Sequence, residues 1–442
     1  MVVRYSRKIV VLVLCALVLT GSFGMFDLRT TQAAAASGCS TENGLFYSAS
    51  VLYGSTCLDS NGWNALTGDS ARTVLYRFAR CADGSIVAAG TRNLYVSDNN
   101  SFKQLTTLKG AVFSLACLSP DDVWVNYLSS VEHFDGKDWT KFDNQKDFGA
   151  TSAKAAIGGI GIGPDKTVWV VTDRTLASYS GGSWKVLEEK SGLDKSFHLN
   201  SAPVFDSKGV LYVSTLNRNI VTFDGSKFGS ISSDDLKSIQ SLAVDANGNI
   251  YIGTNKDGLF VYDGKTWKNY TSVDGLSVNN IEEVAVDNQG RAWVATEWGL
   301  NVLVEGKLTS YTMANSGLVD NNGKGLLVIG DGPALPEAVS KKPSTVKGVI
   351  EVDGKPLANG KVQLCSLSAF LYQGDTPCGD MPDAKTVTTD AAGAFEFDDV
   401  AVGRYNLSFQ VDAKGWVQAT GVKAEATEGK VVDLKTLKFK SQ

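Results

Sequence analysis

Short stretches of alternating hydrophobic and polar residues run along most of the chain, and each is followed by a turn rich in Gly, Asp or Asn. Alternation with a period of two predicts β-strands that are buried on one face. Seven similar units each combine a strand, a tight turn and a residue, usually aromatic, that opens the next strand. These units cover residues 57–63, 95–102, 133–139, 179–184, 222–228, 261–267 and 302–308.

The spacing of the units identifies the repeat. Their last residues recur about every 41 residues, which is the length of one four-stranded blade of a β-propeller. A further strand precedes most hairpins, introduced by a tight turn such as Asp83-Gly84 or Asn247-Gly248, because these residue types tolerate positive φ. The recurring aromatic residues are expected to pack between neighbouring blades rather than to stack on a sugar. They are Trp63, Phe102, Trp139, Trp184, Phe228 and Trp267.

The two ends of the repeat region complement each other. Residues 43–47 align with residues 247–251, so the first blade has its second, third and fourth strands but no first strand. Residues 324–329 predict a first strand that no blade follows. We therefore predict an all-β fold over residues 40–332, a seven-bladed β-propeller in which a composite blade joins the two ends. Such closure removes the exposed edges of a linear array.

The N-terminal segment, residues 1–36, is typical of an export signal. Arg4, Arg7 and Lys8 precede an apolar run, and small residues follow at positions 33–36. The segment is either a signal peptide that is cleaved there or an uncleaved anchor, which would be the protein's contact with a membrane. Both alternatives place the rest of the chain outside the cytoplasm.

Several motifs in the later repeats resemble the two-component regulator propeller repeat. The motifs are Gly258-Leu259, Asp263-Gly264, Trp267 and Asp274-Gly275-Leu276. The resemblance is good over residues 238–318 and looser over residues 44–237. It implies a ligand-binding, sensor-type propeller outside the cytoplasm of a bacterium, extracellular or at the cell surface. No segment resembling a histidine kinase follows the propeller, so any signal is expected to pass to a separate kinase.

The C-terminal part is predicted to form a second β domain. Three prolines within residues 333–344 indicate a linker. Residues 345–442 resemble the carboxypeptidase regulatory-like, prealbumin-type β-sandwich, an Ig-like accessory module whose name implies no peptidase activity. The residues that carry this resemblance include Thr389, Asp390, Gly393, Phe395, Gly403 and Tyr405.

Composition and cysteine spacing exclude some classes of function. The net charge is −5 and no stretch combines clustered Lys and Arg with aromatic residues, so nucleic acid is not expected as a partner. Six cysteines follow the export segment, an even number that suggests disulfides in an exported protein. Cys365 and Cys378 lie in one insertion of the C-terminal domain and are expected to pair, whereas Cys81 and Cys117 lie at nearly equivalent places in consecutive repeats and are expected to be neighbours. Cys39–Cys57 is then the remaining pair. No C-x-x-C spacing occurs, and we expect neither a metal site nor a cofactor.

Residues for catalysis are scarce, and we expect no enzymatic activity and no catalytic residues. His133 lies inside a predicted strand, which favours a structural role, whereas His198 lies in a longer loop. Streptogramin lyases are also seven-bladed propellers that use His and Glu on one face, so a lyase is one alternative. Glu282 and Glu283 are adjacent on a strand and point to opposite faces, so they do not form a catalytic couple. The glycines of residues 159–163 precede a strand and not a helix, which argues against a nucleotide-binding loop.

The variable loops of one face are the predicted ligand site. In a propeller the turns between the second and third strands of each blade open on the same face as the connections to the next blade. We expect an exported, non-enzymatic protein that binds an extracellular glycan, peptide or protein on this face as a sensor or scaffold component; a carbohydrate-binding accessory protein is a further alternative. The candidate ligand-binding residues are Tyr53, Arg92, Tyr127, Asp173, Arg174, His198, Arg218, Asn255, Glu297 and Trp298.

Overall fold

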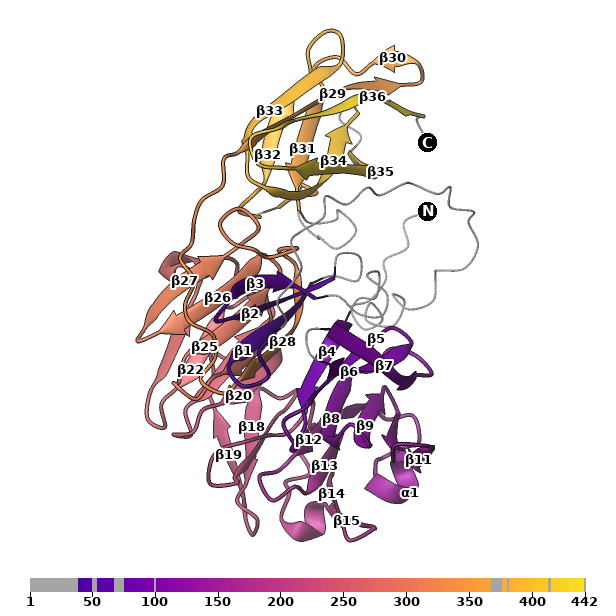
Figure 1. Cartoon of the computed structure of the whole chain (residues 1–442), viewed down its shortest axis with the longest axis vertical. Coiled ribbons are helices and arrows are strands. Elements are labelled where there is room, and N and C mark those ends of the chain that lie inside the picture. Colours follow the sequence, from indigo (N-terminus) through magenta and orange to yellow (C-terminus); the bar gives the residue numbers. More distant parts are fainter. Residues whose placement is uncertain are drawn as a thin grey trace. The chain divides into compact units, whose positions relative to one another are not determined.

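The computed structural model describes residues 39–442, except residues 50–53, 67–74, 99–100, 367–375, 380, 412–414 and 441–442. The described chain is all-β, with only three helices of three to five residues (Figure 1). The predicted export segment, residues 1–36, lies outside the described residues. Within the described part, no helix is long and apolar enough to cross a membrane.

Between Gly44 and Ile329 the described strands form seven antiparallel sheets of four strands each. The first sheet joins both ends of this region and contains β28 (Gly323–Ile329), β1 (Gly44–Ala49), β2 (Ser55–Asp59) and β3 (Gly62–Ala65). The second and third sheets contain β4 (Leu75–Arg80), β5 (Ile86–Gly90), β6 (Asn93–Asp98) and β7 (Ser101–Thr107), then β8 (Ser114–Ser119), β9 (Asp122–Tyr127), β10 (Ser130–Phe134) and β11 (Trp139–Asp143).

The remaining four sheets follow in chain order. The fourth and fifth contain β12 (Ile157–Ile162), β13 (Val168–Thr172), β14 (Leu176–Ser180) and β15 (Ser183–Leu187), then β16 (Val204–Phe205), β17 (Leu211–Ser214), β18 (Asn219–Phe223) and β19 (Phe228–Ser232). The sixth and seventh contain β20 (Ile239–Val244), β21 (Ile250–Thr254), β22 (Leu259–Tyr262) and β23 (Trp267–Tyr270), then β24 (Ile281–Val286), β25 (Ala292–Thr296), β26 (Gly299–Val304) and β27 (Lys307–Tyr311). The short helices α1 (Asn144–Phe148), η2 (Glu189–Ser191) and η3 (Ser272–Asp274) lie in connections between sheets.

Turn chemistry explains why the hairpins form where the sequence predicts them. In the turn between β22 and β23, the Asp263 carboxylate accepts the backbone N–H groups of Lys265 (2.8 Å) and Thr266 (2.7 Å). Gly264 has φ +89°, a conformation that a residue with a Cβ rarely adopts. The turns at Asp135 and Asp224 repeat these side-chain bonds. The Asp-Gly turns therefore fix the hairpin register locally.

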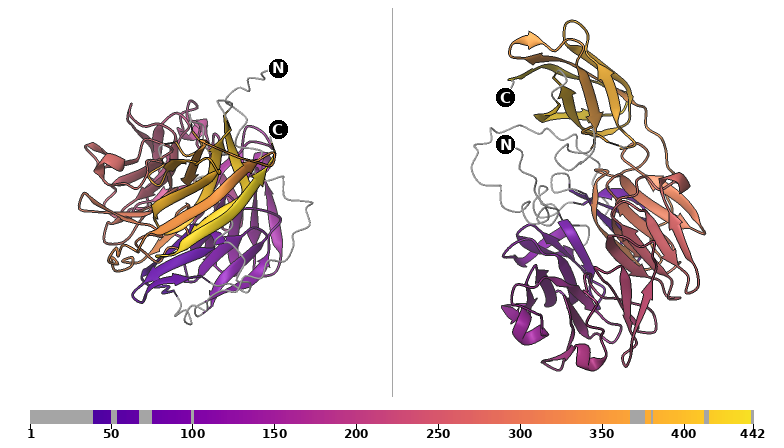
Figure 2. Two further views of the ribbon diagram at one scale, coloured as in Figure 1. Left: turned by 90° about the horizontal axis from the view of Figure 1, so that it is seen from above. Right: turned by 180° about the vertical axis from the view of Figure 1, so that it is seen from behind.

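The composite first sheet is confirmed. β28 pairs antiparallel with β1 from Gly44↔Ile329 to Ala49↔Gly323, so the indigo N-terminal strands lie among orange strands from the end of the repeat region (Figures 1 and 2). The Tyr47 hydroxyl donates to the carbonyl of Asn321 at 2.9 Å. Closure therefore rests on a full strand pairing between residues nearly 300 positions apart.

The first strands of the sheets pack against one another in sequence. β24, β28, β4, β8 and β12 are successive neighbours, as are β16, β20 and β24. Where β12 meets the segment before β16, a Cβ on Gly159 would lie 2.5 Å from the Ala202 Cβ, and one on Gly161 would lie 2.5 Å from the Pro203 carbonyl oxygen. The glycines of residues 159–163 therefore allow two sheets to approach closely, which gives the run a structural explanation.

The repeated aromatic residues pack in two ways. Between sheets, Trp184 of β15 meets Trp124 of β9 edge-on at 5.8 Å, and Trp63 of β3 meets Tyr311 of β27 at 5.7 Å. Phe102 likewise contacts Phe46 of the neighbouring sheet. Trp139, Phe228 and Trp267 instead lie against Phe134, Phe223 and Tyr262 of their own sheets. Each of these three also packs against a buried cluster that contains residues of the preceding sheet, so all six repeated aromatic residues pack between neighbouring sheets as expected.

The C-terminal residues form a β-sandwich. One sheet contains β29 (Ser344–Val352), β30 (Lys355–Pro356), β33 (Ala394–Val400) and β36 (Val431–Phe439); the other contains β31 (Lys361–Cys365), β32 (Lys385–Thr388), β34 (Gly403–Gln410) and β35 (Trp416–Ala426). Side chains from both sheets share one buried core that includes Val346, Phe397, Leu364 and Phe409. The finer resemblance to the carboxypeptidase regulatory-like family stays a prediction.

All three predicted disulfides are present: Cys39–Cys57, Cys81–Cys117 and Cys365–Cys378. Cys81 directly follows β4 and Cys117 lies in β8, so their bond joins the first strands of adjacent sheets. Cys39 ties the start of the described chain to β2. Cys365 ends β31 and its bond stays within the sandwich.

We predict that a chain ending at Asp320, which lacks β28, loses the cooperative unfolding of the propeller, because β1 then loses its partner strand. The expected loss of unfolding free energy is more than about 4 kcal/mol. Denaturant titration monitored by tryptophan fluorescence measures it, since eight of the nine Trp residues precede residue 300. A chain ending at Pro343 is the control and should keep the propeller transition. Equal midpoints for the two chains would contradict this assignment.

We also predict that Cys81→Ser/Cys117→Ser lowers the unfolding free energy of the propeller by about 4 kcal/mol, because the bond closes a loop with a sequence separation of 36. The same fluorescence titration measures the loss. The matched variant Cys365→Ser/Cys378→Ser should leave that transition unchanged, since its bond lies in the sandwich. The prediction fails if both double variants shift the propeller transition alike.

Candidate functional site

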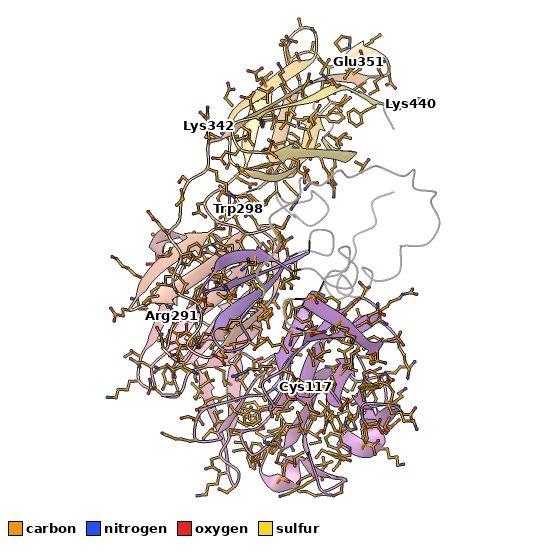
Figure 3. The ribbon with its side chains drawn as sticks, in the orientation of Figure 1. Cys117, Arg291, Trp298, Lys342, Glu351 and Lys440 are labelled. Atoms are coloured by element: carbon orange, nitrogen blue, oxygen red, sulfur yellow. A yellow bond between two sulfur atoms is a disulfide. The ribbon has the colours of Figure 1, made fainter. Side chains whose placement is uncertain are left out.

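The strand register defines one face of the propeller on which loops and strand starts meet. In the seventh sheet Ile281, at the start of β24, pairs with Thr296, which directly precedes the turn at Glu297 and Trp298. The pairs Leu75↔Gly90 and Ile157↔Thr172 show the same arrangement in the second and fourth sheets, where the start of the first strand lies beside the end of the second strand. Arg291 and Trp298, which flank β25, lie toward opposite faces (Figure 3). We call the face with the turns after residues 90, 127, 172, 214, 254 and 296 the channel face.

A cavity of about 470 Å³ lies at the centre, lined near the starts of the first strands of all seven sheets. Register shifts at the beginnings of β4, β12, β20 and β24 mark β-bulges there. A bulge turns a side chain away from the regular alternation and is common next to binding sites. The lining residues that come closest to these strand starts are Arg77, Phe113, Gly158, Asn200, Gln240, Glu282 and Lys324.

Charged groups on one side of this cavity bind the closing strand to its neighbours. Lys324 Nζ lies 2.5 Å from Glu282 Oε1, and the Leu326 N–H donates to Glu283 Oε2 at 2.8 Å. Arg77 donates from Nη1 to the Lys324 carbonyl (2.9 Å) and from Nε to the Phe113 carbonyl (3.0 Å). Burial raises the pKa of the Glu283 carboxyl above its usual value, while Arg77 and the Leu326 N–H partly oppose the shift. These groups therefore hold β24, β28, β4 and β8 together at the mouth of the channel.

Two of the predicted ligand residues meet across neighbouring sheets. Arg174 Nη2 lies 3.1 Å from His198 Nε2, and Arg174 Nη1 donates to the Lys195 carbonyl. Since Arg is always a donor, His198 Nε2 is the acceptor and the neutral ring carries its proton on Nδ1. The Leu216 N–H donates to the His198 carbonyl at 2.8 Å. The pair thus joins the loops of the fourth and fifth sheets.

Other predicted ligand residues are already engaged by the protein. Asp173 Oδ2 accepts the Thr151 hydroxyl at 2.6 Å. The Tyr127 hydroxyl accepts the Lys109 N–H at 3.3 Å, and burial raises the pKa of this phenol to about 12. Asn255 and Glu297 donate backbone N–H groups to Ser238 and Asn280 in the preceding connections. These four residues shape the loops of the channel face.

Trp298 is largely buried. The residue is only 8% exposed, so it offers a ligand little surface, and its role in binding stays a prediction. Its backbone N–H donates to the Thr296 hydroxyl at 3.0 Å within the turn. By contrast, Arg92 and Arg218 are exposed and their side chains form no hydrogen bond or ion pair within the described residues. Tyr53 lies outside the described residues.

His133 lies in β10, the structural position that the sequence predicts. Its ring stacks on Trp124 at 4.1 Å, and Nε2 lies 2.9 Å from Asp122 Oδ1. The carboxylates of the turns between first and second strands are also engaged: Asp245 accepts the N–H groups of Asn247 (2.9 Å) and Asn249 (2.8 Å). These side chains stabilise the fold.

Sequence reasoning did not single out Arg77, Phe113, Gln240 and Lys324 at the channel mouth. A sequence pattern could have identified these positions. Residues 239–244 and 281–286 both consist of Ile, two polar residues and then three apolar residues. Polar residues at the second and third positions of a buried first strand indicate the bulge that turns them toward the channel.

Four exposed hydrophobic side chains lie on the channel face. Among the described residues 44–329, the exposed large hydrophobic side chains are Phe113 (53%), Leu128 (42%), Leu216 (65%) and Val273 (94%). Phe113 precedes β8 and Val273 lies in η3, both in connections between sheets, whereas Leu128 and Leu216 lie in turns between second and third strands. All four therefore lie on the channel face.

A comparison with known protein families gives one match. A family model described as two component regulator propeller matches residues 235–256. This match supports the resemblance to the two-component regulator propeller over residues 235–256, which contain β20 and β21. No curated protein matches the chain.

Several solved structures are similar to parts of the chain. One is the extracellular domain of the putative hybrid two component system BT4673 from B. thetaiotaomicron, with 21% identity and a TM-score of 0.47, covering 62% of this chain but only 38% of that one. Virginiamycin B lyase from Staphylococcus aureus has 14% identity and a TM-score of 0.44, covering 54% of this chain and 84% of that one. PorZ, a surface component of the type-IX secretion system of Porphyromonas gingivalis, has 14% identity and a TM-score of 0.45, covering 86% of this chain and 62% of that one.

We predict that the pH dependence of stability changes in Glu283→Gln. Because burial raises the native pKa above the usual 4.5, the native protein holds the proton more tightly than the unfolded chain. The resulting stabilisation is full below pH 4.5 and is lost as the pH rises through the native pKa. Gln keeps an acceptor for the Leu326 N–H and does not ionise. The unfolding free energy of the variant should therefore rise relative to that of the wild type between pH 4 and pH 7.

Denaturant titrations of both proteins over this pH range measure the difference between their unfolding free energies. Glu283→Ala is the companion variant: it leaves the Leu326 N–H without its acceptor and should cost about 1–3 kcal/mol. A difference between wild type and Glu283→Gln that does not vary with pH would show that Glu283 titrates normally.

Proposed function

We propose that this chain is an exported, non-enzymatic propeller that binds a ligand or a partner protein on its channel face. The observation that carries the proposal is that the exposed large hydrophobic side chains of the described residues 44–329, which are Phe113, Leu128, Leu216 and Val273, all lie on that one face. Their restriction to one face marks it as the candidate interaction surface. Loops on a rigid β scaffold are also where binding residues are usually found.

Export and a sensor or scaffold role complete the proposal. Three disulfides favour an oxidising compartment, outside the cytoplasm. The basic N-terminus and apolar run of the export segment favour the same place. The match of residues 235–256 to the two component regulator propeller favours a protein that binds a ligand and passes its bound state to a separate partner.

The two alternatives receive less support from the site. A lyase needs a histidine that is free to reach a substrate. His133 lies in β10, where its ring stacks on Trp124 and Nε2 lies 2.9 Å from Asp122 Oδ1. Nε2 of His198 already accepts a hydrogen bond from the Arg174 guanidinium, 3.1 Å away. A sugar-stacking surface needs exposed aromatic rings, and the repeated aromatic residues pack on neighbouring rings within or between sheets. Among the described residues of the channel face, Phe113 is the exposed aromatic side chain.

We predict that Phe113→Ser/Leu128→Ser/Leu216→Ser weakens ligand binding at least about tenfold, because these side chains supply apolar contact area. Binding to peptide and glycan arrays measures it, with hits quantified by fluorescence anisotropy. Thermal stability should change little, since the three side chains are exposed. The control Lys137→Ser/Lys227→Ser/Lys265→Ser alters turns of the opposite face. Loss of binding in the control variant, or full binding in the apolar variant, would place the site elsewhere.

A further inference from the structure

The segment that leads into the fifth sheet is held by the turns on either side of it. It comprises residues 194–199, which we call the entry segment, and it belongs to the connection between β15 and β16 on the channel face. From the fifth sheet, the Leu216 N–H donates to the His198 carbonyl at 2.8 Å. Asn217 Nδ2 of the same turn donates to the Ser196 carbonyl at 2.7 Å.

Arg174, in the turn after β13, binds the entry segment from the fourth sheet. Its Nη1 donates to the Lys195 carbonyl, and its Nη2 lies 3.1 Å from His198 Nε2. Beside it, the Leu199 N–H donates to the Asp173 carbonyl at 3.0 Å. Arg174 Nε is buried and has no hydrogen-bond partner within the described residues. The guanidinium therefore depends on the Lys195 carbonyl and the His198 ring as its acceptors.

The contact between Arg174 and His198 requires a neutral imidazole. A guanidinium is always charged and can only donate, so Nε2 accepts through its lone pair. An imidazole ordinarily takes up a proton between pH 8 and pH 5, and the protonated ring carries an N–H on both nitrogens. Protonation of His198 therefore removes an acceptor from Arg174 and places two positive charges 3.1 Å apart.

Other charged groups around the His198 ring do not offset this repulsion by binding it. Within the described residues, no carboxylate forms a hydrogen bond or ion pair with the ring, because Asp173 accepts from the Thr151 hydroxyl (2.6 Å) and Asp194 from the Ser196 N–H (2.8 Å). The charged residues of the surrounding turns and connections, besides Arg174, are Lys154, Asp173, Glu188, Glu189, Lys190, Asp194, Lys195 and Arg218.

The other histidine of the chain has the opposite surroundings. His133 Nε2 lies 2.9 Å from Asp122 Oδ1, and a carboxylate is a better partner for a protonated ring than for a neutral one. Acid therefore strengthens the contact of His133 and weakens that of His198. Of the two histidines, His198 is the one whose protonation loosens the structure.

We infer that the contact between Arg174 and His198 is a pH-sensitive latch on the entry segment. The latch is closed at neutral pH and opens as the pH falls, because the open state binds the proton that the closed state excludes. Asn200, the residue after the entry segment, lines the channel cavity, so opening alters one wall of that cavity. The latch is independent of the proposed function, whereas its effect on ligand binding rests on that function.

Hydrogen exchange of the full chain, followed by mass spectrometry at pH 7.5 and pH 5, tests the latch. Protection factors are compared, because they correct for the pH dependence of the intrinsic exchange rate. Peptides that contain Leu199 and Leu216 report the backbone bonds on the two sides of the entry segment. Their protection should fall at least about tenfold at pH 5, since local opening sets the exchange rate.

The sixth and seventh sheets supply an internal control. Their equivalent bonds run from the Asn255 N–H to the Ser238 carbonyl (3.1 Å) and from the Glu297 N–H to the Asn280 carbonyl (3.4 Å), with no histidine at either acceptor. Protection of these two amides should change less than about threefold between the two pH values. An equal fall in all three sheets would show a general loosening in acid and would overturn the inference.

Three matched variants identify the groups responsible. His198→Gln offers an amide oxygen to Arg174 but takes up no proton, so its protection should not fall at pH 5. Arg174→Gln removes the opposing charge and should also lose the fall, whatever its protection at pH 7.5. His133→Gln is the control and should keep the wild-type fall. A wild type without the fall, or a fall that persists in His198→Gln, would reject the latch.

These measurements use no ligand, so their failure leaves the proposed function standing. Conversely, full binding by the Phe113, Leu128 and Leu216 serine variant would reject the proposed function and leave the latch. A ligand found on the arrays should bind more weakly at pH 5 than at pH 7.5, and this difference should be smaller for His198→Gln. Equal affinities at the two pH values would reject the effect of the latch on binding.

Discussion

The pairing of β28 with β1 is the constraint on which the rest of the propeller depends. Each sheet buries its apolar faces against the next, so a missing partner anywhere would expose a sheet face and a strand edge. β28 completes the ring: it pairs with β1 and packs against β24 and β4. Near its beginning it is bonded to the side chains of Glu282, Glu283 and Arg77. The central cavity exists because this strand completes the ring of first strands.

Closure also explains how charge is distributed. Around the channel mouth, Glu282, Glu283, Arg77 and Lys324 are bonded to one another or to the backbone of β28, and such partly buried charged groups are costly to leave unpaired. The hairpins are fixed by turn residues such as Asp263 and Gly264 on the other face. On the channel face, Asp173 and Tyr127 bind neighbouring segments, whereas the exposed side chains of Arg92 and Arg218 form no hydrogen bond or ion pair within the described residues. The loops of the channel face carry the proposed binding function.

Several particular residues show how far the sequence leads. The period of about 41 residues and the Asp-Gly turns predict four-stranded sheets, because both depend on interactions within one hairpin. The incomplete first repeat predicts the partner of β1, and equivalent positions in consecutive repeats predict the Cys81–Cys117 bond. The sequence also indicates which loops share a face, since that follows from the connectivity of an antiparallel sheet. Trp298 lies in one of those loops, yet it is buried.

By itself the sequence determined the features that depend on neighbouring residues and on the repeat: the all-β class, the hairpins, the order of the strands, the closing pair and the disulfides. Only the tertiary structure decided which side chains converge at the channel, that Gly159 and Gly161 serve a close approach to Ala202 and Pro203, and that Trp298 packs inside while Phe113, Leu128 and Leu216 remain exposed. The reason is physical. Exposure and convergence depend on how bulges turn individual side chains and on how tightly adjacent sheets approach, and both are set by residues far apart in the chain.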